Sequence, residues 1–261
     1  MKEIAVITPY NNEDYYQIKK ANDNVISQKH ENSNFARFND EFRCHHFIIV
    51  DGVDKKKNLN KLKCEKIELL KNHNDNGNTP RSVGTSTVIK RNYDFIMYLD
   101  ADNWFLPGHV STLLNLIKDK TCIGCSYRSF YTEDEKIINF REDSDCLDKT
   151  HVDTSCFLIP KFFYNMINVW HLIPKPTTQW SDRIFYNYLR AKNCSLKYSE
   201  THSVAFRTLY DTHYKEGNLP LPKNVKNSIQ ISKKAINYFS EEKNKAEFLK
   251  IFGFWWVPDK K

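Results

Sequence analysis

Phe95-Ile96-Met97-Tyr98-Leu99-Asp100-Ala101-Asp102 is the stretch that decides the fold, because an unbroken apolar run leads directly into two carboxylates. A short apolar run of this kind is typical of a strand buried on both faces of a parallel sheet. Pro107 suits the first position of a helix. Apolar residues at helical spacing follow it: Val110, Leu113, Leu114 and Ile117. The stretch therefore predicts a strand, an acidic turn and a helix.

Two earlier runs repeat this arrangement. Residues 4–8 are apolar and lead into Pro9-Tyr10-Asn11, and residues 46–50 lead into Asp51. A shorter strand is expected at 67–70, with helices near 11–25 and 83–91. Strands that alternate with helices predict a mostly parallel sheet flanked by helices, and ligands bind such sheets beyond the carboxyl ends of their strands. Thr8–Asn11, Asp51 and Asp100–Asp102 should therefore line one crevice.

The second half of the chain has a different pattern. Strands are expected at 122–130 and 155–159, separated by a polar, acidic loop. Ser181 is expected to cap a helix, and a further helix is expected at about 228–239 in a Lys- and Asn-rich region. We divide the chain into a first half (1–120), a second half of the same domain (121–214), and a basic, aromatic C-terminal extension (215–261).

Composition narrows the class of protein. The 261 residues are 40% hydrophobic with a formal charge of +7, which fits a folded protein with anionic partners. No signal peptide and no apolar run of about 18 residues is evident. Seven cysteines, an odd number, suggest reduced thiols in the cytoplasm, and the pair Cys122 and Cys125 is interpreted as buried and structural. The chain has seven glycines and none directly after the first strand, which excludes P-loop and dinucleotide signatures.

Asp100 and Asp102 carry the clearest chemistry. Carboxylate oxygens are hard ligands that suit Mg²⁺ or Mn²⁺, and these ions commonly bridge a protein to a diphosphate. A second D-x-D, Asp143-Ser144-Asp145, has no strand before it and is interpreted as a solvated loop.

Four motifs in order resemble those of a GT-A fold glycosyltransferase, similar to family 2. They are Thr8-Pro9-Tyr10-Asn11 after the first strand, Asp51 after the second, Arg81-Ser82-Val83-Gly84, and Asp100-Ala101-Asp102. The resemblance implies a Rossmann-like fold and a UDP-sugar donor. The tract between Gly84 and the D-x-D strand is longer than the commonest family pattern. The resemblance implies that residues 1–120 are the nucleotide-sugar-binding half and residues 121–214 the acceptor-binding and catalytic half.

The resemblance also implies roles for these residues. Thr8, Pro9, Tyr10 and Asn11 would line the base and ribose pocket, and Asp51 would hydrogen-bond uracil. Asp100 would face the ribose or the metal, with Ala101 beside it, and Asp102 would ligate the metal under the diphosphate. Arg81 would offset the diphosphate charge.

The family places a catalytic carboxylate at the start of a helix in the acceptor half, and Asp182 fits that position. It would take the proton from the acceptor hydroxyl in an inverting transfer. Asp153 and Glu200 are rival bases. His202 would add a metal ligand, with His213 as its competitor. Trp170 and Trp180 suit either sugar stacking or core packing.

Alternatives remain at this stage. A sugar nucleotidyltransferase would also use a carboxylate-bound metal. A non-catalytic module that binds nucleic acid or another anion would account for the net positive charge. We expect no nucleic acid, because carboxylates at strand ends would repel phosphates. The expected acceptor is a glycan or lipid-linked molecule in bacterial surface polysaccharide synthesis. The C-terminal lysines and Phe252–Trp256 could rest on the inner face of the membrane, or the aromatics could pack on the domain.

Overall fold

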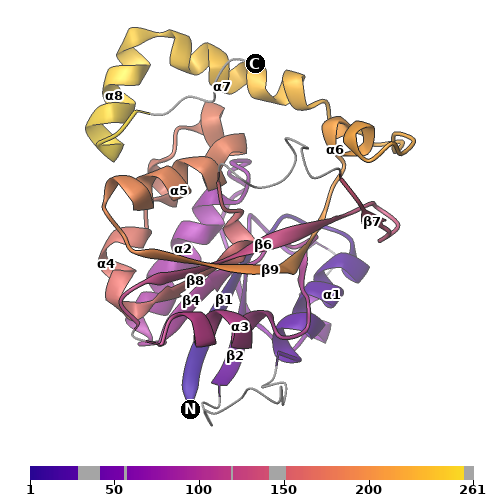
Figure 1. Ribbon diagram of the computed structural model, residues 1–261, viewed down its shortest axis with the longest axis vertical. Coiled ribbons are helices and arrows are strands. Elements are labelled where there is room, and N and C mark those ends of the chain that lie inside the picture. The colour runs from indigo at the N-terminus through magenta and orange to yellow at the C-terminus, as the bar shows by residue number, and fades with distance from the viewer. Residues whose placement is uncertain (29–41, 56–57, 119, 141–150, 256–261) are drawn as a thin grey trace.

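The computed structural model describes residues 1–28, 42–55, 58–118, 120–140 and 151–255. Within these ranges one mixed sheet of nine strands crosses the molecule in the order β3-β2-β1-β4-β8-β6-β9-β5, with β7 beside β6. Helices flank this sheet (Figure 1). The α/β class and the GT-A type of architecture expected from the sequence are confirmed.

The first half of the chain forms the parallel part of the sheet. Its strands are β1 (Lys2–Tyr10), β2 (Phe42–Val50), β3 (Glu65–Glu68) and β4 (Phe95–Tyr98). The helices that cover it are α1 (Tyr15–Ile26), capped by Asp14, α2 (Asn78–Lys90) and α3 (His109–Leu116), with a 3₁₀ turn η1 (Asn58–Lys61). The four predicted strands are present. Strands β1, β2 and β4 are largely buried apolar runs, whereas β3 alternates partly buried and exposed residues and begins two residues before the predicted 67–70. Pro107 precedes the Gly108 cap of α3, so it does not open that helix as expected.

The second half adds mainly antiparallel pairs. Strands β6 (Ile123–Tyr131) and β8 (Phe157–Pro160) match the predicted ones, and β8 pairs antiparallel with both β4 and β6. Short strands β5 (Trp104–Phe105) and β7 (Ile137–Ile138) complete the edges. Strand β9 (Leu196–Arg207), parallel to β6, was not predicted. Its first half is largely exposed and polar, so it lacks the apolar run that revealed the others.

Helices and 3₁₀ turns connect these strands and form the C-terminal end. They are η2 (Thr154–Cys156), η3 (Lys161–Phe163), α4 (Tyr164–Ile167), η4 (Trp170–Leu172), η5 (Lys175–Trp180), α5 (Ser181–Ala191), α6 (Asp211–Glu216), α7 (Ser228–Ser240) and α8 (Glu242–Phe252). Ser181 is the first residue of α5 and not its cap, because its hydroxyl donates to the Thr178 carbonyl at 2.6 Å. Helix α7, predicted almost to its bounds, lies with α8 at the end of the molecule opposite the N-terminus (Figure 1).

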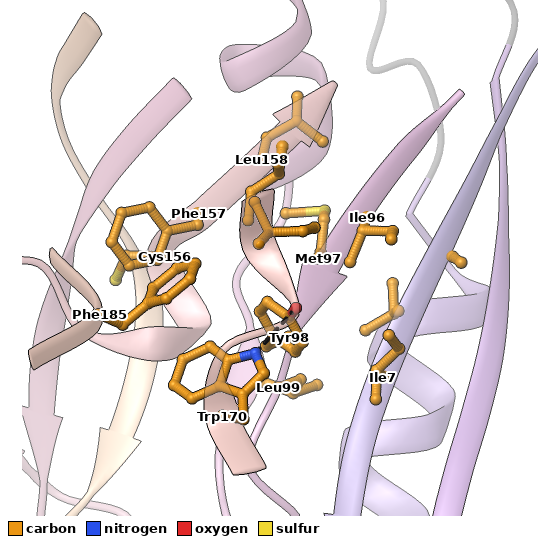
Figure 2. Packing of buried hydrophobic residues seen from close by; sticks show 14 of the residues in the cluster. Ile7, Ile96, Met97, Tyr98, Leu99, Cys156, Phe157, Leu158, Trp170 and Phe185 are labelled. Carbon is orange, nitrogen blue, oxygen red and sulfur yellow. Dashed lines mark hydrogen bonds between the residues drawn. The ribbon is translucent and has the colours of Figure 1, made fainter. Parts of the chain in front are cut away.

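Trp170 belongs to the core between β4 and α5. Its side chain is fully buried, and its ring stacks on Phe185 with centroids 4.3 Å apart. Its indole N–H donates to the Tyr98 hydroxyl at 3.0 Å, as Figure 2 shows. Thr85 bonds the same hydroxyl at 2.8 Å. Trp170 is therefore a core residue. A ring enclosed in this way has no exposed face on which a sugar could stack.

The aromatic residues of the C-terminal extension pack onto the domain. Phe239, Phe248 and Phe252 are buried, and Phe254 lies partly buried against them. Trp255 is 41% exposed but contacts Phe239 edge-on at 5.2 Å. No helix among the described residues is long and apolar enough to cross a membrane. Of the two interpretations of this segment, packing on the domain is the one that residues 252–255 adopt, whereas Trp256 lies outside the described residues.

Two smaller expectations also meet the structure. Cys122 and Cys125 are buried beside and on β6, as interpreted from the sequence. The second D-x-D, at 143–145, lies outside the described residues.

Candidate active site

A cleft of about 700 Å³ opens at the carboxyl ends of β1, β2 and β4. Most residues expected to form a site line it: Pro9, Tyr10, Asn11, Asp51, Arg81, Asp100, Ala101, Asp102 and Asp182. The first eight come from the parallel half of the sheet, whereas Asp182 comes from the first turn of α5. The fold thus joins the D-x-D turn and the candidate base in one cavity, although 80 residues separate them in sequence.

Thr8 and His202 do not line this cleft, contrary to expectation. Thr8 is fully buried, and its hydroxyl lies 2.8 Å from Nε2 of His46, whose Nδ1 lies 2.8 Å from the Asn22 amide. Alternation along β1 turns Thr8 towards α1 while the strand end reaches the cleft. His202 is exposed on β9, where its Nδ1 lies 2.8 Å from the Arg128 carbonyl oxygen.

Asp51 lines the cleft and is itself buried. Its backbone N–H donates to the Tyr10 carbonyl at 2.8 Å, which holds the ends of β1 and β2 together. Its carboxylate accepts from the backbone N–H groups of His73 and Asn74 at 2.8 and 3.1 Å. The His73 ring lies 2.9 Å from the same carboxylate. These contacts fix Asp51 without the need for a ligand.

The N-terminal end of α2 is pressed closely against the strand ends. Gly77 adopts a φ of +78°, and a Cβ there would lie 2.7 Å from the Pro9 side chain. About two turns further into the helix, a Cβ on Gly84 would lie 2.5 Å from Ile7. Glycine at both positions lets α2 approach β1. Arg81, between them, donates to the Asn76 carbonyl at 2.8 Å and forms an ion pair with Asp100.

A cluster of three carboxylates, Glu13, Asp100 and Asp102, dominates the electrostatics of this wall. Burial, followed by repulsion from Asp100, raises the pKa of Asp102 to about 6. Burial raises the pKa of Glu13 to about 7, with a smaller contribution from both aspartates. Sequence reasoning missed Glu13, because Asn11-Asn12-Glu13-Asp14 reads as a helix start. The sequence signal for Glu13 as a site residue was its position three residues after the end of β1.

Asp100 and Asp102 fit a divalent cation in chemical type, since buried, mutually repelling carboxylates are relieved by a positive charge. Among the described residues, no group of three or more His, Cys, Asp or Glu side chains closes around a common point. A cation held here would therefore need further oxygen ligands from water or from a bound diphosphate, which is usual for Mg²⁺.

Asp182 lies on the opposite wall and is held by basic neighbours. Its Oδ2 lies 3.2 Å from Nε2 of His151, and its Oδ1 accepts from the Arg183 backbone N–H at 2.8 Å. Burial raises the pKa of Asp182, but the charges of His151, Arg183 and Arg128 outweigh burial and hold it below its usual range. The carboxylate is therefore ionised throughout the physiological pH range and can accept a proton.

The rival bases are less suited to that role. Asp153 also lines the cleft, but its carboxylate pairs with Arg128 at 2.5 Å and accepts from the Ser155 backbone N–H at 2.9 Å. It caps η2 and anchors an arginine that packs on Phe206. Glu200 is exposed on β9 and does not line the cleft.

His213 reaches the cleft that His202 does not. Its Nδ1 lies 2.6 Å from the Thr208 hydroxyl, and burial lowers its pKa to about 3, aided by the charge of Arg128. The imidazole is therefore neutral, which is the form that binds metals. Trp180 lines the cleft as well, and its ring stacks on Phe239 of α7 with centroids 6.3 Å apart.

Solved structures with similar folds include three of TarS from S. aureus, a GT-A-type glycosyltransferase. The full TarS chain matches with a TM-score of 0.53 and 12% identity, over 97% of this chain and 48% of TarS. TarS 1–349 in complex with UDP matches with a TM-score of 0.54 and 12% identity, over 96% and 81% of the two chains. TarS 1–349 alone matches with a TM-score of 0.52 and 15% identity, over 97% and 72%.

This chain therefore spans about half the length of full TarS, and the likeness at such low identity concerns the fold. No family model matches the sequence. No curated protein matches it either.

Proposed function

We propose that this protein is an inverting, metal-dependent glycosyltransferase that uses a UDP-sugar. The observation that supports this most is that Asp100 and Asp102 share one cleft with Asp182. One wall suits the donor and its cation, and the other offers an ionised base. The TarS structure that shares the fold was solved with UDP, which supports the choice of nucleotide.

The donor would occupy the wall formed by the parallel strands. Pro9, Tyr10 and Asn11 would contact the base and ribose, with Asp51 as the acceptor for uracil N–H. Asp100 and Asp102 would hold Mn²⁺ or Mg²⁺, which supplies charge neutralisation to the diphosphate. Arg81, held by its ion pair with Asp100, would offset part of the diphosphate charge.

The transfer needs one proton acceptor and one leaving group. The acceptor oxygen forms a bond to the anomeric carbon while Asp182 takes its proton. The bond from that carbon to the β-phosphate oxygen breaks, and its electron pair leaves with UDP. Because Asp182 is a weak base at its lowered pKa, it takes the proton as the new bond forms rather than before. His151 keeps the carboxylate oriented through their contact.

His213 replaces His202 in this proposal as the additional metal ligand. It lies in the cleft in neutral form, and its Nδ1 is fixed by Thr208, an arrangement that orients the other ring nitrogen. His202 lies outside the cleft with its Nδ1 at the Arg128 carbonyl oxygen.

The acceptor proposed here is a glycan or a lipid-linked molecule, and the pathway is bacterial surface polysaccharide synthesis at the inner face of the membrane. Support comes from the net charge of +7 and from the exposed lysines of the C-terminal extension, such as Lys233, Lys243 and Lys250. These favour anionic surroundings.

Calorimetric titration of UDP, with and without Mn²⁺, tests the proposal. Asp102→Ala should abolish the metal-dependent part of binding. Asp23→Ala, which removes an exposed carboxylate of α1 that is paired with Lys19 and lies outside the cleft, should leave it unchanged. Absence of UDP binding under every metal condition would move the test to GDP and dTDP. If these also fail to bind, the protein does not use a nucleotide-sugar.

A further inference from the structure

Lys226 lies on the C-terminal extension, yet it lines the cleft of the D-x-D turn. The extension reaches the cleft through Lys226 and Ser228 and through Ile231 and Ser232 of α7. The C-terminal extension therefore forms part of the cleft wall, in addition to the helix pair α7 and α8.

The backbone around Lys226 is fastened to the segment that follows β9. The Lys226 N–H donates to the Leu209 carbonyl at 2.8 Å, and the Lys226 carbonyl accepts from Asp211 at 3.0 Å. The Asp211 carboxylate accepts from both the backbone N–H and the hydroxyl of Ser228, at 2.9 and 2.8 Å. These bonds are independent of the lysine side chain, so the position of Lys226 is built into the fold.

The ammonium group of Lys226 has no carboxylate within ion-pair distance among the described residues. Its nearest ring is that of Tyr210, 5.7 Å from Nζ to centroid, which is a weak contact. Arg81 and Arg128, in the same cleft, are held by Asp100 and Asp153. Lys226 is also close enough to Asp102 for its charge to oppose the effect of burial on the pKa of that carboxyl.

We propose that Lys226 binds the diphosphate of the donor and stabilises the charge on the departing UDP. The inference rests on the proposed function and adds a residue of the extension to the donor site. When the bond between the anomeric carbon and the β-phosphate oxygen breaks, that oxygen gains a full negative charge. A lysine beside that oxygen stabilises its charge more strongly in the transition state than in the bound donor. The lysine itself transfers no proton or electron.

The experiment compares binding of UDP and of uridine, each with Mn²⁺, to wild type and to Lys226→Gln, Lys226→Arg and Lys223→Gln. Uridine lacks both phosphates, so it reports the base pocket alone. Lys226→Gln should weaken UDP binding about tenfold and leave uridine within about twofold. Lys226→Arg keeps the charge and should stay within about threefold of wild type for UDP. Lys223, exposed in the same segment and outside the cleft, is the matched control.

The outcomes separate the two proposals. If wild type binds UDP and Lys226→Gln binds it equally well, the role of Lys226 is wrong while the nucleotide site stands. Equal weakening of UDP and uridine would also overturn it, because that pattern indicates a distorted pocket. If wild type binds neither, the proposed function itself fails, and the role of Lys226 fails with it.

Discussion

Replacing Glu13 with Gln should stabilise the metal-free protein at high pH. Glu13 lies within a cluster of like charges, where burial raises its pKa from 4.5 to about 7. Its Oε2 accepts from the Asn11 backbone N–H at 2.6 Å, and a Gln side chain retains an oxygen for this bond. The substitution therefore removes the charge and leaves the local structure in place.

The magnitude follows from the two pKa values. Below about pH 4.5 the carboxyl is protonated in both the folded and the unfolded state, and its ionisation has no effect on stability. Between pH 4.5 and 7 the unfolded state ionises first, so the folded state loses stability. At about 1.4 kcal/mol per pKa unit the loss reaches at most about 3 kcal/mol above pH 7.

Urea denaturation in EDTA, followed by tryptophan fluorescence at pH 5 and pH 8, measures this difference. Glu13→Gln should gain up to about 3 kcal/mol over wild type at pH 8 and less than about 1 kcal/mol at pH 5. Glu200→Gln, at an exposed position outside the cleft, should show little change at either pH. A gain at pH 5 equal to that at pH 8 would refute the reasoning, as would a loss at pH 8.

Three further outcomes are expected. Asp182→Asn should reduce UDP release from the donor about a hundredfold or more and change UDP affinity by less than about twofold; a large loss of UDP affinity would contradict its role as the base. His213→Ala should weaken Mn²⁺-dependent UDP binding about tenfold in calorimetry, whereas His202→Ala should not, and equal effects would remove His213 from the metal site. Trp170→Ala should lower the free energy of unfolding by about 3–5 kcal/mol in urea titration. The substitution empties a fully buried site and removes the indole N–H that donates to the Tyr98 hydroxyl. A loss under about 1 kcal/mol would show that the core closes around the gap.

Local patterns predicted the parallel half of the sheet well. Strands β1, β2 and β4 each contain a short apolar run, and the carboxyl ends of parallel strands meet at one edge of a sheet. Pro9–Asn11, Asp51 and Asp100–Asp102 could therefore be assigned to one cleft from their positions after such runs, and the structure places them there. Strand β9 escaped prediction, because its exposed first half has no comparable run.

The prediction that Thr8 lines the cleft was wrong. A residue two positions before the strand end can face the core, and the buried contact with His46 shows that this one does. The distinction depends on which face α1 covers, and that is a property of packing.

The sequence alone determined the α/β class and the strand-end carboxylates, because both follow from residues adjacent in the chain. Only the tertiary structure decided which histidine reaches the cleft, that Glu13 joins the two aspartates, and that Lys226 closes the site from the C-terminal extension. Each of these depends on contacts between residues that are distant in sequence. The folding of the second half sets such contacts, since it brings α5, the end of β9 and α7 over the edge of the parallel sheet.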